Sequence, residues 1–246
     1  MVAPSLSASS PAGWFVTLYP GAGEAGGSFR YSVPVQRYAG GGDPDRSRKE
    51  AARRAARMVR RYCAHNRLNR LGTLTYRGAG CHDPFQLRRD VAQFFRTLRD
   101  LLGGQAFAYV WVPEWHTTDH GQHVHFAVGR FIARRSIERA WGHGFVHIKL
   151  LGHLPSGSTP RDEARVAARY LSKYVHKAFD ARRVPGLHRY EVAQGFQPER
   201  VRLSGRSVED VMAQAAEAMG AEPVEVWTSD EAIGWEGPPA VWAMWS

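Results

Sequence analysis

Apolar and polar positions alternate along several short runs in the middle of the chain, with the period of two that is typical of β-strands. These runs are rich in β-branched and aromatic residues, and we expect strands at 71–76, 106–115, 122–128 and 144–150. A short polar loop, Thr117 to Gly121, separates the second run from the third. These two strands should therefore form a hairpin with antiparallel pairing.

Apolar positions three and four residues apart predict helices between and after the strands. Val91, Phe94 and Leu98 show this spacing after Pro84, and Gly103 ends the pattern. Helices are predicted in the same way at 45–68, 85–102, 133–141, 161–179 and 208–219. The order of elements and the hairpins among the strands favour an α+β fold. We expect a central antiparallel sheet with its helices on one side.

The two ends of the chain carry weaker patterns. Residues 14–19 and 29–33 are expected to form a strand pair, joined by the Gly-rich stretch 21–27. No Gly-Lys-Ser/Thr follows these glycines and no helix opens after them, so we interpret them as a flexible linker and not as a phosphate-binding loop. A short strand is expected at 224–227. The stretch 189–203 is ambiguous, with a strand pair as one interpretation, and the Trp-rich end shows no usable period.

Three segments follow from these patterns. Residues 1–13 are rich in Ala, Ser and Pro and are expected to be disordered. Residues 14–203 should form the main domain, including the N-terminal strands and a basic helix. Residues 204–246 should form an acidic C-terminal helix and a Trp-rich tail.

The charge of the chain is large and unevenly distributed. The formal net charge is +10, with fifteen Lys and Arg against three acidic residues in 46–99, and eight acidic residues but no Lys or Arg in 207–246. A basic body with an acidic end is typical of a polyanion-binding protein, nucleic acid above all, although such charge also serves solubility alone. The basic helix could follow a phosphate backbone through four arginines, Arg53, Arg57, Arg60 and Arg61.

Cysteine usage and hydropathy restrict the compartment. Cys63 and Cys81 are the only cysteines, which excludes a disulfide framework and a Cys-based zinc site. The first thirteen residues lack the basic and apolar regions of a signal peptide, and no stretch approaches the ~18 apolar residues of a membrane span. We therefore expect a cytoplasmic protein with no membrane partner.

Residues 116–125 contain four of the eleven histidines. On a strand, His123 and His125 point to one face and Val124 to the other, which makes a two-ligand metal site. Glu114 is the candidate third ligand, because the hairpin would bring it alongside the histidines. Three residues of the connecting loop are rivals for this place, namely Asp119, His116 and His120.

A second group of candidate residues lies on the helix predicted at 161–179. Tyr170, Lys173, Tyr174 and Lys177 are spaced so that all four share one face. By itself this stripe is also compatible with the margin of an ordinary surface helix. However, the chain has 29 Arg and only four Lys, and two of these Lys lie here, which suggests that a compact, titratable cation is needed. A tyrosine attacks a phosphodiester when a divalent ion and a nearby Lys assist, so the two groups together indicate phosphodiester chemistry.

These motifs, in this order, resemble those of the HUH endonucleases, specifically the rolling-circle replication initiators with two tyrosines. The resemblance rests on His123-Val-His125 followed by Tyr170-xxx-Tyr174, with Leu71-Gly-Thr-Leu-Thr-Tyr76 similar to the family's first motif. It covers about residues 70–180. It implies an HUH nuclease fold, in which a central antiparallel sheet related to RRM and ferredoxin-like domains carries the histidines and the tyrosine helix lies across from them.

The resemblance also implies an activity, namely nicking and joining of single-stranded DNA. His123, His125 and Glu114 would hold Mg²⁺ or Mn²⁺. Tyr170 or Tyr174 would attack the scissile phosphate, giving a 5′-phosphotyrosine and a free 3′-hydroxyl that primes synthesis.

Other residues and partners follow from the same resemblance. Lys173 and Lys177 would orient the phosphate or stabilise charge, and Thr75 and Tyr76 of the first motif would help to position DNA. The substrate would be a single-stranded replication origin of a plasmid or phage. No helicase-type Gly-x-x-x-x-Gly-Lys-Ser/Thr motif occurs, so a host helicase would be a partner, together with a DNA polymerase.

Two alternatives stay open. A transposase or conjugative relaxase of the same superfamily would use the same chemistry on another substrate. A non-catalytic, RRM-like nucleic-acid-binding protein is an alternative of a different class, suggested by the fold and by Gly144-Phe-Val146.

Overall fold

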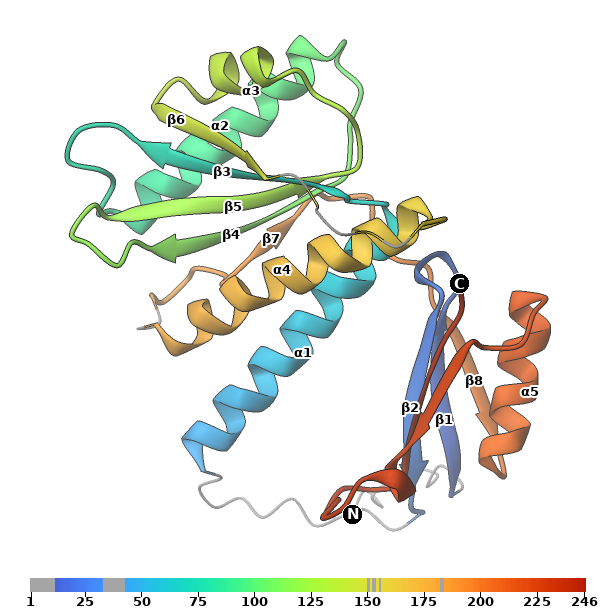
Figure 1. Ribbon diagram of the computed structural model, residues 1–246. Coiled ribbons are helices and arrows are strands. Elements are labelled where there is room, and N and C mark those ends of the chain that lie inside the picture. Colours follow the sequence, from blue (N-terminus) through green and yellow to red (C-terminus); the bar gives the residue numbers. More distant parts are fainter. Residues whose placement is uncertain (1–11, 33–42, 150, 152–153, 155, 182–183) are drawn as a thin grey trace, which may run out of the picture. The chain divides into compact units, whose positions relative to one another are not determined.

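The computed structural model describes residues 12–32, 43–149, 151, 154, 156–181 and 184–246. The chain divides into two units, Gly42–Pro198 in one and Met1–Gly41 with Glu199–Ser246 in the other. Each unit contains a five-stranded sheet whose neighbouring strands are all antiparallel (Figure 1). The α+β class is confirmed, but with two sheets where one was expected.

The sheet of the unit Gly42–Pro198 has the strand order β6-β3-β5-β4-β7. Its strands are β3 (Arg70–Tyr76), β4 (Tyr109–Trp115), β5 (Gln122–Val128), β6 (Gly144–Lys149) and β7 (Glu191–Val192). Its helices are α1 (Pro44–His65), α2 (Pro84–Leu101), α3 (Arg134–Trp141) and α4 (Pro160–Asp180). The expected hairpin is confirmed, since β4 and β5 pair over their whole lengths.

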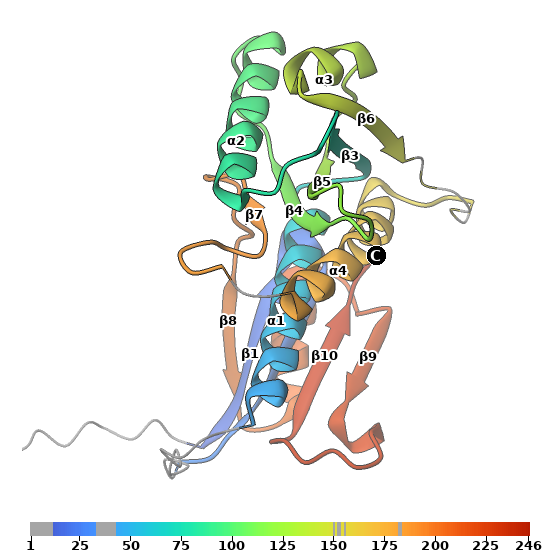
Figure 2. The same cartoon turned by 90° about the vertical axis from the view of Figure 1, so that its left-hand side faces the viewer.

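Helices cover both faces of this sheet, so the expectation of helices on one side was wrong. Helices α2 and α3 pack on one face, and α1 and α4 pack on the other (Figures 1 and 2). The central strand β5 shows the reason, because six of its seven residues are buried. Val124 and Phe126 enter the first core and Ala127 enters the second. A strand that buries both faces needs an apolar layer on each.

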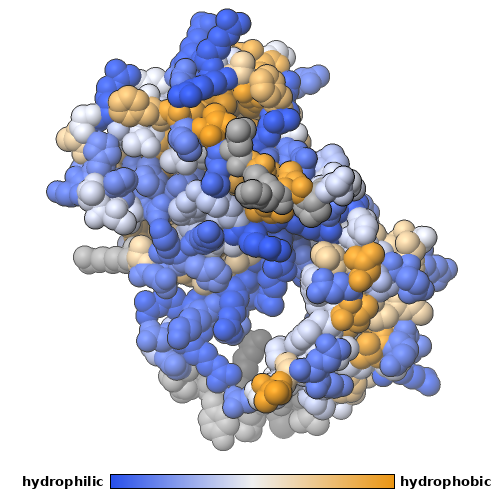
Figure 3. All heavy atoms as spheres, in the orientation of Figure 1, coloured by the Kyte–Doolittle hydropathy of each residue, from blue (hydrophilic) through white to orange (hydrophobic). Residues whose placement is uncertain are grey.

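Helix α1 packs lengthwise against α4 through small residues. Ala55, Ala56 and Val59 of α1 share a core with Ala167 and Ala168 of α4. Alanines at the contact let the two backbones approach closely. The polar side of α1 is left exposed, and hydrophilic residues cover it in Figure 3.

The other unit joins the two ends of the chain in one sheet, with the order β8-β1-β2-β10-β9. Its elements are β1 (Gly13–Tyr19), a 3-10 turn (Pro20–Ala22), β2 (Glu24–Arg30), β8 (Val201–Gly205), α5 (Val208–Met219), β9 (Glu225–Thr228), a second 3-10 turn (Ser229–Glu231) and β10 (Ala240–Met244). Apolar residues of α5 cover one face of this sheet, among them Val211 and Ala215.

This pairing corrects two expectations about the chain's organisation. The boundaries at 14 and 203 do not separate the units, because β1 and β2 pair with β8 and β10 and not with the sheet of 70–192. The strand pair that was one interpretation of the ambiguous stretch 189–203 is not found among the described residues, because β7 and β8 belong to different sheets. Residues 1–11 of the segment expected to be disordered lie outside the described residues.

The Gly-rich stretch 21–27 is not a linker. Residues 24–27 belong to β2, which is paired with β1 from Tyr19↔Glu24 onward. A Cβ at Gly27 would lie 2.0 Å from the carbonyl oxygen of Phe15 on the neighbouring strand, so the close approach of backbones requires glycine there.

None of the helices in the described part of the chain has the length and apolar character needed to span a bilayer.

Candidate active site

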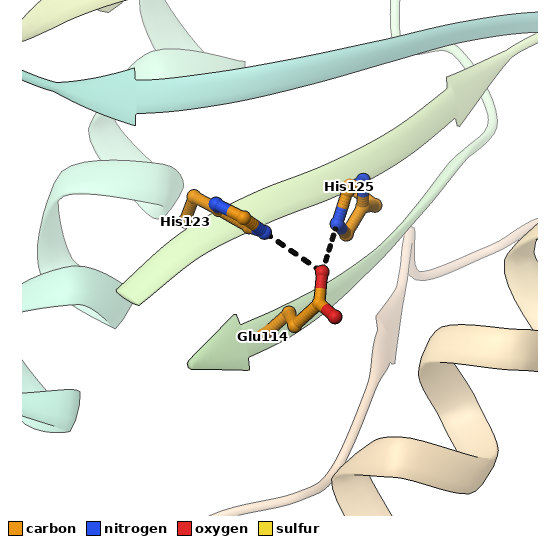
Figure 4. A group of neighbouring side chains, drawn as sticks. All are labelled: Glu114, His123 and His125. Atoms are coloured by element: carbon orange, nitrogen blue, oxygen red, sulfur yellow. Dashed lines mark hydrogen bonds and ion pairs between the residues drawn. The ribbon is translucent and has the colours of Figure 1, made fainter. Parts of the chain in front are cut away.

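Three side chains on the hairpin of β4 and β5 converge on one point. Glu114 is directly opposite His123 in the antiparallel register, and His125 is two residues further along β5, so all three lie on the face that α4 covers. Glu114 Oε2 accepts hydrogen bonds from His123 Nε2 at 2.8 Å and from His125 Nε2 at 2.7 Å (Figure 4). The ligand atoms of these three residues lie within 4.8 Å of one another, a grouping that could hold a metal ion.

The protonation states of this cluster suit a cation. Burial alone would raise the pKa of Glu114, but hydrogen bonds from Lys177, His123 and His125 outweigh it and lower the pKa to about 2. Burial lowers the pKa of His125 to about 4 against the opposing effect of Glu114. At neutral pH the site therefore combines an ionised carboxylate with a neutral imidazole, which is the form that binds metal.

A second hydrogen bond orients His125. Its Nδ1 lies 3.1 Å from Thr73 Oγ1 on the adjacent strand β3. With a metal on Nε2, the ring proton would lie on Nδ1 and would be donated to this hydroxyl, so the contact would hold the ring in the direction that metal binding needs. Sequence reasoning placed Thr73 in the Thr-rich first motif but missed this role. This role could have been found from the antiparallel pairing of β3 with β5, which places Thr73 opposite His125.

The two tyrosines of α4 lie against this cluster. The ring of Tyr174 stacks on that of His125, with centroids 3.5 Å apart and 16° between the planes. Tyr174 Oη donates a 2.6 Å hydrogen bond to Tyr170 Oη. Burial, followed by the hydrogen bond and charge interaction with Tyr170, raises the pKa of Tyr174.

Ammonium groups surround the tyrosine pair. Lys177 Nζ donates to Glu114 Oε1 and lies 5.5 Å from the centre of the Tyr174 ring. Lys173 Nζ and Lys149 Nζ lie 5.6 and 4.8 Å from the centre of the Tyr170 ring. Lys149 comes from β6 and was not among the predicted site residues. The spacing of residues along the sequence does not indicate that Lys149 lies close to α4.

The stretch of chain that carries this site is similar to a known family of proteins. The family model of replication-associated protein ORF2 matches residues 69–179. This stretch is less than half of the chain and runs from β3 to the end of α4, so it includes Glu114, both histidines and both tyrosines. No curated protein and no solved structure matches the chain. The similarity is to a family of replication proteins and concerns the part of the chain that carries the site.

The rival ligands lie outside the cluster. Within the described residues the cluster contains only Glu114, His123 and His125. His116 Nδ1 lies 2.7 Å from Thr118 Oγ1, His120 Nε2 lies 2.9 Å from the carbonyl oxygen of Tyr76, and the side chain of Asp119 is exposed.

The residues predicted to contact DNA are distributed over two regions. Arg53 and Arg57 are exposed on α1, while Arg60 and Arg61 are half-buried on the same helix. Thr75 lies two residues from Thr73 and so faces the same side of the sheet as the metal cluster.

Tyr76 faces the other side of the sheet and does not line the site. Its side chain is buried in the core with α2, and its Oη donates to Asp90 Oδ2 at 2.8 Å, so we correct its assignment as a DNA contact.

Proposed function

We propose that the chain is a metal-dependent enzyme that nicks and joins single-stranded DNA through a tyrosine, and that it starts rolling-circle replication of a plasmid or phage. The match to the family of replication-associated protein ORF2 supports the role in replication. The stacking of Tyr174 on His125 carries the chemical part of the proposal, because it puts two phenols beside a group of metal ligands.

The donor set fits Mg²⁺ or Mn²⁺. Glu114, His123 and His125 offer one carboxylate and two imidazoles, and an ion held by these three ligands would also be able to bind phosphate oxygens. When bound, the ion would polarise the phosphate and offset its negative charge. The imidazoles suit Mn²⁺ better than Mg²⁺, whereas Mg²⁺ is the more abundant ion.

The tyrosine oxygen would form a bond to phosphorus while the bond from phosphorus to the 3′ oxygen breaks. The phenol gives up one proton and the departing 3′ oxygen gains one, so the products are a 5′-phosphotyrosine and a 3′-hydroxyl. Lys173 and Lys177 would stabilise negative charge on the phosphate and on the attacking oxygen. One ester replaces another, and rejoining needs no ATP.

Tyr170 is the better placed first nucleophile. Its oxygen accepts the hydrogen bond from Tyr174, which would stabilise the phenolate that forms at Tyr170. Lys149 and Lys173 lie over its ring and favour the same negative charge. Tyr174 would then serve the second transfer, which releases a closed circle.

Additional contacts would hold the strand and continue replication. The exposed arginines of α1, Arg53 and Arg57 among them, would bind phosphates without regard to sequence and make binding depend strongly on salt. Thr75 would contact the strand close to the cluster. A host helicase and a DNA polymerase would act on the nicked origin.

The test is formation of a covalent adduct. The full chain is incubated with single-stranded origin oligonucleotides and Mn²⁺, and the mixture is run on a denaturing gel. We expect a slow-migrating protein–DNA species that is lost with EDTA and in Glu114→Ala, but kept in Glu138→Ala, which removes an exposed carboxylate on α3. A protein that binds DNA without forming any adduct would be a binding module and would contradict the proposal.

A further inference from the structure

A small pocket opens beside the metal cluster, at the edge of β4. Strand β7 pairs with β4 only at Val110 and Trp111, so the end of β4 from Pro113 onward has no neighbour on this side among the described strands. The pocket lies there, between the end of α4 and the start of α2, and has a volume of about 250 Å³. This is below the roughly 300–1,000 Å³ of pockets that hold whole drug-sized ligands, so it suits a single ring system.

The pocket shares Glu114 with the cluster, and Lys177, which pairs with Glu114, also lines the pocket. A group bound in the pocket therefore lies next to the place where a phosphate would meet the cluster. Much of the remaining wall is apolar, including Leu87, Ala178 and Leu187.

One polar group of the wall lacks a partner. Gln122 lines the pocket and is only 6% exposed, and its Oε1 makes no hydrogen bond within the described part of the chain. A buried amide oxygen without a partner is costly, and a ligand that donates a hydrogen bond to it removes this cost. Gln122 precedes the ligand His123 on β5, so its side chain leaves the strand on the opposite face.

We propose that this pocket takes one nucleobase of the substrate strand, adjacent to the scissile phosphate, and that Gln122 reads its edge. The proposal rests on the function proposed above. The apolar walls would hold the flat ring, and Gln122 Oε1 would accept a hydrogen bond from an exocyclic amino group. Adenine, cytosine and guanine each carry such an amino group on the Watson–Crick edge, whereas thymine carries none. Gln122 is thus a specificity-determining residue. Glu114 and Lys177, which line the same pocket, would fix the position of the DNA strand relative to the metal ligands.

The first test measures base preference during cleavage. Oligonucleotides randomised at the positions around the nick are incubated with the full chain and Mn²⁺, and the adducts are sequenced. At one position we expect depletion of thymine relative to the bases that carry an amino group, on the order of tenfold. Gln122→Leu should lose this preference at that position alone, while Gln105→Leu, an exposed glutamine replaced in the same way, should keep it.

The second test does not depend on cleavage. Binding of dAMP, dCMP and dTMP to the metal-free chain is measured by calorimetry. We expect dAMP or dCMP to bind about tenfold more tightly than dTMP in the wild type, with equal affinities in Gln122→Leu. Leu187→Trp, which adds bulk to the wall of the pocket at a half-buried position, should weaken binding of all three.

The two tests separate the pocket from the nicking activity. Discrimination among nucleotides without any adduct would leave the pocket in place and overturn the proposed function. Equal binding of the three nucleotides, or an unchanged base preference in Gln122→Leu, would overturn the pocket's role whether or not the chain nicks DNA.

Discussion

At the scale of single residues, His125 is held on three sides. Thr73 contacts its Nδ1, Glu114 accepts from its Nε2, and the ring of Tyr174 covers its face. Each contact restricts a different freedom of the ring, namely its rotation, the position of Nε2 and its tilt. The histidine therefore connects Glu114 with the pair of tyrosines on α4.

Replacing Thr73 by Val tests the orienting hydrogen bond. Valine keeps the shape of the side chain but leaves Nδ1 without its partner, so the affinity for Mn²⁺ should fall about 10- to 100-fold. Calorimetric titration with Mn²⁺ gives the Kd directly. Thr97→Val on α2, which lies outside the cluster, is the matched control. Equal Kd values in wild type and Thr73→Val would show that Thr73 has no part in metal binding.

Single phenylalanine variants test the order of the tyrosines. Tyr170→Phe should abolish the first covalent adduct, because it removes the proposed nucleophile. Tyr174→Phe should keep the adduct but form it roughly 10- to 100-fold more slowly, since a hydrogen bond to a charged oxygen is lost. Adduct formation is followed over time on denaturing gels. The reverse pattern would assign the first attack to Tyr174.

At the scale of elements, α4 carries the tyrosines and its position depends on close packing. Ala167 and Ala168 are fully buried between α4, α1 and the sheet, and Tyr170 and Tyr174 pack at the edge of the same core. A larger residue at this contact would push the helix away from β5. The distance between Tyr174 and His125 is therefore set by alanines that do not take part in the chemistry.

Ala168→Leu should lower the free energy of unfolding by about 1–3 kcal/mol, because the core has no space for the added atoms. Urea denaturation measures this change. Arg169→Leu, at the exposed neighbouring position, should stay within about 0.5 kcal/mol of the wild type. If Ala168→Leu is as stable as the wild type and forms adduct at the same rate, close packing does not position the tyrosines.

Most elements of the unit Gly42–Pro198 can be predicted from local pattern. The periods of two and 3.6 locate β3, β5, α2 and α4 to within one or two residues. The hairpin register follows from the short loop, and with it the meeting of Glu114 and His123. The contacts between Tyr174 and His125, or between Lys149 and Tyr170, could not be derived from pattern, because they depend on how a helix lies on a sheet.

At the scale of the whole molecule, the described chain consists of two units, and the second is formed by segments far apart in the sequence. Strand β2 pairs with β10, more than two hundred residues away. Pairing between such distant segments leaves no local pattern in the sequence. Strand β10 was not predicted, because its Trp-rich stretch shows no clear period of apolar residues. The glycines of β2 suggested a linker because their use, a close approach to β1, is visible only when the partner strand is present.

Gly27→Ala tests whether the two units are independent in stability. The added Cβ would collide with the backbone of Phe15, so hydrogen exchange should speed up in β1, β2 and β10. Protection of β3 and β5, and the Kd for Mn²⁺, should not change. Ser28→Ala on the same strand is the control. Loss of protection in both sheets together would mean that the units unfold as one.

The most direct test of the central claim is to locate the DNA on the protein. Trypsin cuts after Arg169, Lys173 and Lys177, so Tyr170 and Tyr174 fall in separate peptides, Tyr-Leu-Ser-Lys and Tyr-Val-His-Lys. The adduct formed with Mn²⁺ is trimmed with nuclease, digested and analysed by mass spectrometry. We predict a nucleotide on the Tyr170 peptide, and on the Tyr174 peptide after the second transfer. An adduct whose nucleotide lies on neither peptide would contradict the mechanism.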